Sequence, residues 1–232
     1  MSDFMEKKPM IDQIEAIAFD IDGTLYSSAL FYLRIAPYFF RHIAFFANYN
    51  KVRKILHRTA PLADFYGYQA RLLEDFMKES KGKSRQMIQD IVYDGMKPYF
   101  AKTKPYRDVD EFFEWCKSLG LKIGILSDFP PEQKGDIFNL APYCDVIMGS
   151  EAHGALKPSI YTFGQLAMKL GVPNDKILYV GNSVRADING AKAAGMKTAY
   201  IQTGFARLFN KRPSNADISF KSYRKLRDLM LK

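Results

Sequence analysis

The chain has 232 residues, a length that suits one full hydrophobic core or one core with a smaller module. Its apolar content of 47% is ordinary for a globular protein, and its formal net charge is +9. No uncharged apolar run reaches the roughly 18 residues of a membrane span, and the N-terminal MSDFMEKKPM lacks the apolar segment of a signal peptide.

Short apolar runs alternate with segments of helical spacing along most of the chain. We predict strands over residues 14–19, 121–126, 177–180, 196–201 and 217–220, and helices over 108–120, 159–171, 185–194 and 222–231. The first of these helices has a candidate capping residue in Asp108, with Glu111 three positions later, and ends at Gly120. Strands that alternate with helices of about 10–15 residues indicate right-handed βαβ units. The predicted fold class is α/β, with a Rossmann-like parallel sheet.

Residues 27–104 differ in kind from the rest. Leu, Ile, Phe and Tyr recur there at helical spacing, with Pro37, Pro61 and Gly82 as breaks. This pattern predicts a set of helices inserted into the α/β core. The core domain would then consist of residues 1–26 and 105–232, and the connections would lie near residues 26–28 and 103–106.

Aromatic residues are concentrated at the start of this insertion. Residues 31–49 contain eight Phe and Tyr among nineteen positions. They could form the core of the insertion or a wall that meets the substrate. They could also form a helix at a lipid surface, because Arg34 and Arg41 flank apolar faces.

The insertion also carries most of the excess positive charge, with 14 Lys and Arg against six Asp and Glu in residues 27–104. Such charge can steer an anionic substrate toward a cleft, or it can be a solvated face with no further role. No nucleic-acid recognition motif accompanies it, so no nucleic-acid partner is expected.

Two cysteines and three histidines give little sign of metal or disulfide chemistry. Cys116 and Cys144 each lie within an apolar pattern, which predicts free thiols and a reducing, cytoplasmic location. The histidines lack the spacing of zinc ligands.

Asp20 and Asp22 stand two residues apart where the first apolar strand stops, in the run AIAFDIDGTL. In extended backbone, residues i and i+2 point to the same side, so both carboxylates can face one reacting atom. One can act as a nucleophile while the other moves protons, and their mutual repulsion calls for a cation. The alternative is a turn in which both side chains cap backbone groups.

Three later segments place polar side chains beside probable strand ends or helix starts. Ser127 and Asp128 follow the strand over residues 121–126, Lys157 lies in GALKPS, and Asn182 and Asp187 follow the strand over residues 177–180. In open parallel sheets, sites form outside the carboxyl ends of the strands, so these groups could converge.

In this order, FDIDGTL, ILSD, GALKPS and VGNSVRADINGAKAAGM resemble the four motifs of the haloacid dehalogenase-like (HAD) superfamily, which is dominated by phosphatases. The resemblance covers nearly all of the chain outside residues 27–104. It implies that the insertion is a helical cap over the active site. It also implies that Asp20 is the nucleophile and Asp22 the general acid and base.

The same resemblance implies a substrate site and a metal site. Ser127 and Lys157, with the adjacent Asp128, would bind the phosphorylated substrate, a small-molecule phosphomonoester. Magnesium would be held by a set of four residues, namely Asp20, Asp22 (through its main-chain carbonyl), Asn182 and Asp187.

Asn182 departs from the family pattern, in which the fourth motif commonly reads Gly-Asp. An amide oxygen can ligate Mg²⁺, but the site loses one negative charge. The chain could bind metal more weakly, rely on Asp187, or be a catalytically impaired binding protein. The metal-free dehalogenases of the superfamily also carry Asn in this region, but they attack carbon and do not need Asp22.

The predicted function is therefore Mg²⁺-dependent hydrolysis of a small phosphorylated metabolite through an aspartyl-phosphate. The alternatives are a HAD-fold binding protein, a phosphomutase and a haloacid dehalogenase. No motif in the insertion names the substrate, and no pattern sets the oligomeric state.

Overall fold

The computed structural model describes residues 8–78 and 82–232. The N-terminal segment MSDFMEKKPM, which was not expected to be a signal peptide, therefore lies mostly outside the described residues. Six parallel strands form one sheet in the order β3-β2-β1-β4-β5-β6. They are β1 (Ala16–Phe19), β2 (Lys122–Ser127), β3 (Val146–Gly149), β4 (Ile177–Gly181), β5 (Lys197–Ile201) and β6 (Ile218–Phe220). The predicted α/β fold with a parallel sheet is confirmed, although β3 was not predicted.

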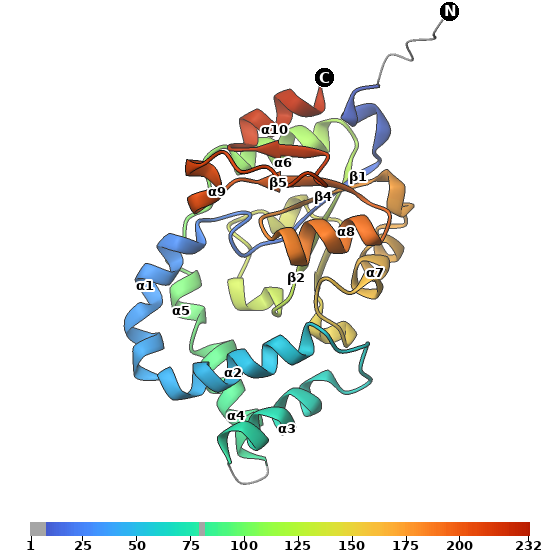
Figure 1. The fold of residues 1–232 in the computed structure, drawn as a ribbon. Helices are drawn as coiled ribbons and strands as arrows, with labels where there is room; N and C mark the ends of the chain where they lie inside the picture. Colours follow the sequence, from blue (N-terminus) through green and yellow to red (C-terminus); the bar gives the residue numbers. More distant parts are fainter. Residues whose placement is uncertain (1–7, 79–81) are drawn as a thin grey trace, which may run out of the picture.

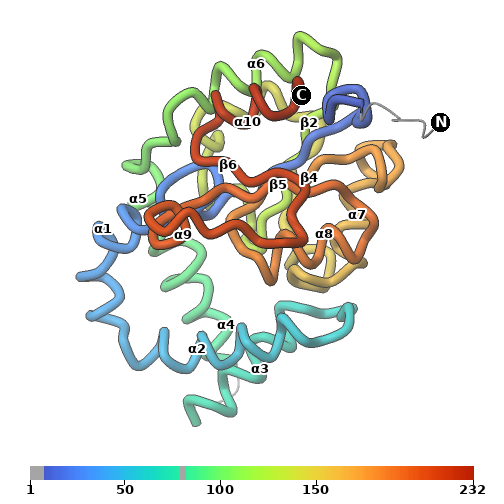
Figure 2. The backbone as a smooth tube through the Cα atoms, turned by 45° about the horizontal axis from the view of Figure 1, so that its top comes forward, coloured from blue at the N-terminus to red at the C-terminus, as the bar shows by residue number. Residues whose placement is uncertain are grey.

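Helices cover both faces of this sheet. Figures 1 and 2 show α6 (Val109–Ser118) and α10 (Tyr223–Met230) on one face, and α7 (Ile160–Leu170) and α8 (Asn189–Ala193) on the other. Ile17 and Phe19 of β1 pack in the apolar cluster under α6 and α10, whereas Ala16 and Ala18 pack in the cluster under α7 and α8. Both sides of β1 are therefore buried, as expected for a parallel strand.

Two of the predicted core helices have the expected ends. The helix α7 begins after Ser159 and ends at Gly171, which has a left-handed φ of 63°. The helix α10 begins after Ser222, whose hydroxyl accepts a hydrogen bond from the amide of Lys225.

One detail of the predicted helices was wrong. Asp108 precedes α6, but its side chain accepts no bond from the helix and instead lies 3.3 Å from Arg107 Nε. The segment predicted to be helical over residues 185–194 is helical, and it consists of a π-helical turn (Val184–Ile188) followed by α8.

The segment between β1 and α6 is helical, as predicted, and lies beyond one end of the sheet (Figures 1 and 2). It comprises α1 (Ser28–Arg41), α2 (Ile43–Leu56), α3 (Phe65–Met77), α4 (Lys83–Ile88), a π-helical segment (Gln89–Asp94) and α5 (Lys97–Phe100). The two segments that connect these helices to the rest of the chain lie side by side. Tyr26 and Pro105 form an antiparallel bridge, and the amide of Tyr106 donates to the Leu25 carbonyl at 2.7 Å.

One of the three predicted breaks in this segment was wrong. Pro37 lies inside α1, which continues through it although proline cannot donate a backbone hydrogen bond. Pro61 does separate α2 from α3, and Gly82 immediately precedes α4.

The remaining helices are short. They are the 3₁₀ turns at Met10–Gln13, Pro131–Lys134, Ala141–Tyr143, Glu151–His153 and Asn174–Lys176, and α9 (Gly204–Leu208). None of the helices described in residues 8–78 and 82–232 is both long and apolar enough to cross a membrane. Cys116 and Cys144 are free thiols, as predicted.

Candidate active site

The predicted site residues gather at the carboxyl ends of neighbouring strands. Asp20 follows β1, Ser127 ends β2, and Asn182 follows β4. The amide of Asp20 still donates to the Val180 carbonyl of β4 at 3.0 Å, which continues the pairing of the two strands. The strand order therefore brings together residues that are far apart in the sequence.

Lys157 joins two of the predicted carboxylates. Its Nζ lies 2.7 Å from Asp20 Oδ1 and 2.7 Å from Asp187 Oδ1. All three residues are at least 95% buried. The Tyr179 hydroxyl, which lies 3.3 Å from the same Nζ, donates to the Leu126 carbonyl of β2. The ammonium is thus held between strands β1 and β4 in a site closed to bulk water.

Two carboxylates share this single ammonium, and this arrangement shifts the pKa values of Lys157 and Asp20. Burial opposes the charge of Lys157, but Asp187 and Asp20 raise its pKa well above the usual value, so it stays protonated. Burial raises the pKa of Asp20 to about 7, with Asp187 and Asp22 adding to the rise and Lys157 opposing it. A cation beside Asp20 would favour its ionised form.

The second oxygen of Asp20 meets a residue to which the sequence assigned no role. The hydroxyl of Thr24, which is fully buried, donates to Asp20 Oδ2 at 2.9 Å. The same hydroxyl lies 3.5 Å from Asn182 Oδ1, so oxygens of Asp20 and Asn182 flank one side chain. Gly23 makes this approach possible, because a Cβ there would lie 2.2 Å from Asn182 Nδ2.

Asp187 has both of its oxygens engaged. Oδ1 accepts from Lys157, and Oδ2 accepts from the amides of Asn182 at 3.1 Å and Ser183 at 2.9 Å. The π-helical turn that begins at Val184 places the side chain there. Asp187 therefore ties the loop after β4 to Lys157.

Asp22 lies at the edge of the site, with its side chain one-third exposed. The Tyr26 hydroxyl donates to Asp22 Oδ1 at 2.5 Å. Burial and the charge of Asp22 raise the pKa of Tyr26, so the phenol stays protonated and remains a donor. Lys134 Nζ lies 3.2 Å from Asp22 Oδ2 without a well-aligned hydrogen bond, and its side chain is fully buried. Neither neighbour was identified from the sequence.

Ser127 and Asp128 are adjacent in sequence but differ in surroundings. The Ser127 hydroxyl is buried and has no hydrogen-bond partner in the described structure. Asp128 Oδ1 accepts from the Ser150 hydroxyl at 2.8 Å and from the Lys157 amide at 2.9 Å. Burial opposes the charge of Asp128, but nearby Lys157, His57 and Arg53 keep its pKa below the usual value. Asp128 thus anchors the loop that carries Lys157.

Within residues 8–78 and 82–232, no three His, Cys, Asp or Glu side chains form a group able to hold a metal. The donors that do gather are a carboxylate oxygen of Asp20 and the amide oxygen of Asn182, on either side of Thr24. Carboxylate, amide and main-chain oxygens are the ligands that Mg²⁺ prefers, so the chemistry of this donor set fits it. Asp187 fits less well, since its Oδ2 already accepts two backbone amides and its Oδ1 accepts from Lys157, whereas each oxygen of Asp20 accepts a single hydrogen bond.

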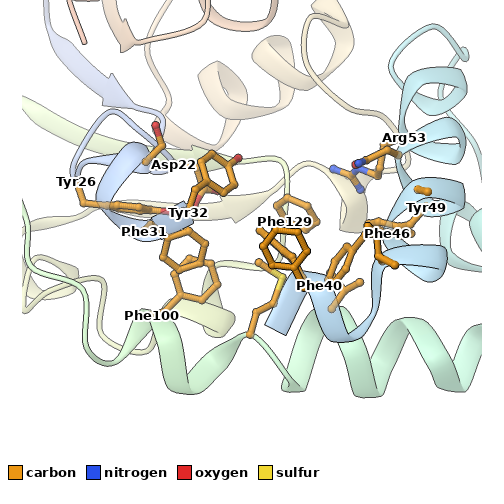
Figure 3. Close-up of a pocket in the computed structure, with 17 residues that line it drawn as sticks. Asp22, Tyr26, Phe31, Tyr32, Phe40, Phe46, Tyr49, Arg53, Phe100 and Phe129 are labelled. Atoms are coloured by element: carbon orange, nitrogen blue, oxygen red, sulfur yellow. Dashed lines mark hydrogen bonds between the residues drawn. The ribbon is translucent and has the colours of Figure 1, made fainter. Parts of the chain in front are cut away.

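A cleft of about 600 Å³ opens from Asp22 toward the inserted helices. Figure 3 shows Asp22 and Arg53 at its opposite ends, with aromatic side chains, including Phe40 and Phe129, between them. Part of the aromatic stretch in α1 and α2 therefore faces this cleft, whereas Phe45 is buried in the core of the insertion.

Comparisons with known proteins identify the family and the fold. A family model described as haloacid dehalogenase-like hydrolase matches residues 14–195. A phosphoglycolate phosphatase from Aquifex aeolicus is 30% identical over 216 residues, covering 86% of this chain and 90% of the relative. A glyceraldehyde 3-phosphate phosphatase from Methanocaldococcus jannaschii is 28% identical, covering 82% and 86%. The crystal structure of a HAD phosphatase from Thermococcus onnurineus has a TM-score of 0.63 at 24% identity, covering 94% and 98%.

Proposed function

The chain belongs to the haloacid dehalogenase-like hydrolases, and from that premise we propose that it hydrolyses a small phosphomonoester through an aspartyl-phosphate at Asp20. The two curated relatives named above are phosphatases that match over more than four fifths of the chain, so the enzyme class is a hydrolase acting on phosphoric monoesters. The observation that best supports the mechanism is the buried carboxylate of Asp20, whose two oxygens meet Lys157 and Thr24.

In the first step, a carboxylate oxygen of Asp20 attacks phosphorus while the ester oxygen leaves. Lys157 is charged and buried, so it offsets negative charge on Asp20 and on the phosphoryl oxygens. The Ser127 hydroxyl, which lacks a protein partner, is available to donate to a phosphoryl oxygen. Asp22 gives a proton to the leaving alkoxide.

In the second step, water attacks phosphorus and releases phosphate and the free Asp20 carboxylate. Asp22 now acts as the base that takes the proton from water. Tyr26 positions Asp22 for both transfers, because its hydroxyl holds one carboxylate oxygen and leaves the second toward Lys134 and the cleft.

We propose Mg²⁺ as the cofactor, held by Asp20, the main-chain carbonyl of Asp22 and Asn182. When bound, it would screen the carboxylates from the phosphoryl oxygens and polarise the phosphoryl group. Asp187 was predicted as a further ligand; its contacts support the role of holding Lys157 and the Asn182 backbone in place.

The helices between residues 27 and 104 are proposed to form a cap over the site, with connections at the paired segments near Tyr26 and Pro105. Such a cap excludes water while the leaving group departs. Its excess of basic residues would draw anionic substrates toward the cleft. The free thiols of Cys116 and Cys144 support a reducing, cytoplasmic setting.

A panel of phosphomonoesters, assayed with and without Mg²⁺, tests this function. We expect turnover that depends on Mg²⁺ and is lost in Asp20→Asn. Phosphoglycolate, glyceraldehyde 3-phosphate and a glycerol phosphate belong in the panel, together with a 2-haloacid as the dehalogenase control. Release of halide in place of phosphate, or binding without turnover of any ester, would contradict the proposal.

A further inference from the structure

We propose that the leaving group of the substrate carries an aromatic ring, which lies in the cleft between Asp22 and Arg53. This inference rests on the proposed phosphatase function and adds the class of ester. The cleft begins at Asp22, the residue proposed to protonate the leaving group, so the group that occupies it is the alcohol side of the ester. Its volume of about 600 Å³ is that of a pocket for a small organic ligand.

The walls of the cleft are mostly aromatic. Nine of its seventeen lining residues are Phe or Tyr, and they come from the insertion, from the turn after β1 and from the loop after β2. Part of the wall is pre-packed: Phe31 stacks on Phe100 with ring centroids 4.5 Å apart, and Phe39 meets Phe46 edge-on at 4.6 Å. These packed ring pairs form an aromatic wall against which a flat ring of the leaving group can lie.

Other cleft residues are apolar but uncovered. Tyr32, Phe40 and Ile43 line the cleft and yet are 58%, 73% and 62% exposed. Phe40 has no aromatic partner among the residues that the structure describes. Large exposed apolar side chains that gather in a concave surface indicate a ligand that covers them.

The two charged groups that line the cleft are already engaged, and its other polar groups are the side chains of Ser28 and Asn50 and three tyrosine hydroxyls. Asp22 is held by Tyr26 and Lys134, and the buried Arg53 guanidinium pairs with Glu151 and lies 4.4 Å from the Phe129 ring centroid. A leaving group with a carboxylate would lose water there without gaining an unpaired cation, since Arg53 is the one cation among the lining residues and is paired with Glu151. An aromatic ring instead gains offset or edge contacts with the walls, each worth roughly two- to tenfold in affinity.

Three primary alkyl monoesters of similar leaving-group basicity test this inference: 2-phenylethyl, 2-cyclohexylethyl and 2-methoxyethyl phosphate. We expect kcat/KM for the phenyl ester to exceed that for the methoxy ester by roughly thirtyfold or more, and that for the cyclohexyl ester by several-fold. Because the phosphate and the chemistry are the same in all three, the differences report on the cleft.

Two variants in α1 provide a matched pair. Phe40→Ala removes an exposed ring that lines the cleft. We expect it to raise KM for the phenyl ester about tenfold and KM for the methoxy ester by a smaller factor. Leu33→Ala is the control, since Leu33 is 75% exposed on the same helix and does not line the cleft. We expect Leu33→Ala to change neither ester.

Equal kcat/KM for all three esters would overturn the inference, and equality of the phenyl and cyclohexyl esters would overturn its aromatic part. An effect of Phe40→Ala on the oligomeric state or on vesicle binding, without an effect on KM, would show that the cleft holds another occupant. Should no ester be turned over, the phosphatase proposal itself fails. Calorimetry would then measure the affinity of Asp20→Asn for the phenyl and methoxy esters. Equal affinities for the two esters would contradict the inference.

Discussion

Asp187 Oδ1 lies 2.7 Å from Lys157 Nζ, the same distance that separates this ammonium from Asp20. The other oxygen of Asp187 accepts two backbone amides of the loop after β4. Asp187 therefore fixes the position of the cation that serves Asp20. This role needs a carboxylate, because each of its three hydrogen-bond partners is a donor.

Asp187→Asn should disturb this arrangement. The amide of Asn has one donor end, which must face either Lys157 or the backbone amides, so a donor meets a donor. We expect a loss of about 2 kcal/mol in the free energy of unfolding and a clear fall in kcat. Ser183→Ala is the control, because the Ser183 hydroxyl has no hydrogen bond with Lys157 in the described structure and accepts one from the Ala186 amide. Unfolding and kinetics of Asp187→Asn that match those of the control would contradict this role.

The pH dependence of the reaction should report on Asp20. Burial raises the pKa of this carboxyl to about 7 without metal, and only the ionised form can attack phosphorus. At low Mg²⁺ we expect kcat/KM to rise with pH up to about 7 and then level off. Saturating Mg²⁺ should move this limb to lower pH, since a cation favours the carboxylate. If kcat/KM at low Mg²⁺ does not change with pH up to about 7, ionisation of Asp20 does not control the reaction in this range.

Asp22→Asn should reduce kcat most for esters with poor leaving groups. A nitrophenolate leaves without protonation, whereas an alkoxide needs a proton. Tyr26→Phe is a useful companion, because it removes the hydroxyl that holds Asp22 at 2.5 Å and keeps the carboxyl itself. We expect it to have the same leaving-group trend with a smaller loss. Burst kinetics separates effects on the second step from effects on the first. Equal losses of kcat for nitrophenyl and alkyl esters would show that Asp22 is not the general acid.

Asn182→Asp should tighten the binding of Mg²⁺. The added charge beside a divalent ion is worth on the order of 1 kcal/mol or more at a partly exposed site, or about tenfold in affinity. Calorimetry or titration of activity measures the change, with Asn182→Ala expected to weaken binding. If the carboxylate variant binds Mg²⁺ no better than the wild type, Asn182 is not a ligand.

The sheet and the positions of the site residues could be predicted because they depend on local patterns. An apolar run that stops at a polar residue marks a buried parallel strand and its carboxyl end, and this holds at Phe19 and Asp20 and at Gly181 and Asn182. The edge strand β3 was not predicted because its apolar run is only three residues long, between Asp145 and Gly149.

The surroundings of the site could not be read from the sequence, because they arise from tertiary contacts. Lys134 is a charged residue in a 3₁₀ turn with no periodic pattern, yet it is buried against Asp22 and the Phe100 and Phe129 rings. Thr24 was visible within the first motif, but its bond to Asp20 depends on the turn after β1. The cleft likewise depends on how α1 and α2 pack, since the same aromatic stretch supplies both core and wall.

The central claim is that Asp20 carries the phosphoryl group. Acid quench of a reaction in its first turnover, followed by borohydride reduction and peptide mass spectrometry, converts an aspartyl-phosphate to homoserine and locates it. Asp22→Asn, given a nitrophenyl ester whose leaving group needs no proton, provides a second sample in which the intermediate should accumulate. Asp20→Asn provides the blank, with a loss of turnover of roughly a thousandfold or more in a folded protein. We predict homoserine at position 20 in the wild type and in Asp22→Asn. Reduction at another residue, or turnover of phosphate with no reducible intermediate at position 20, would contradict the account.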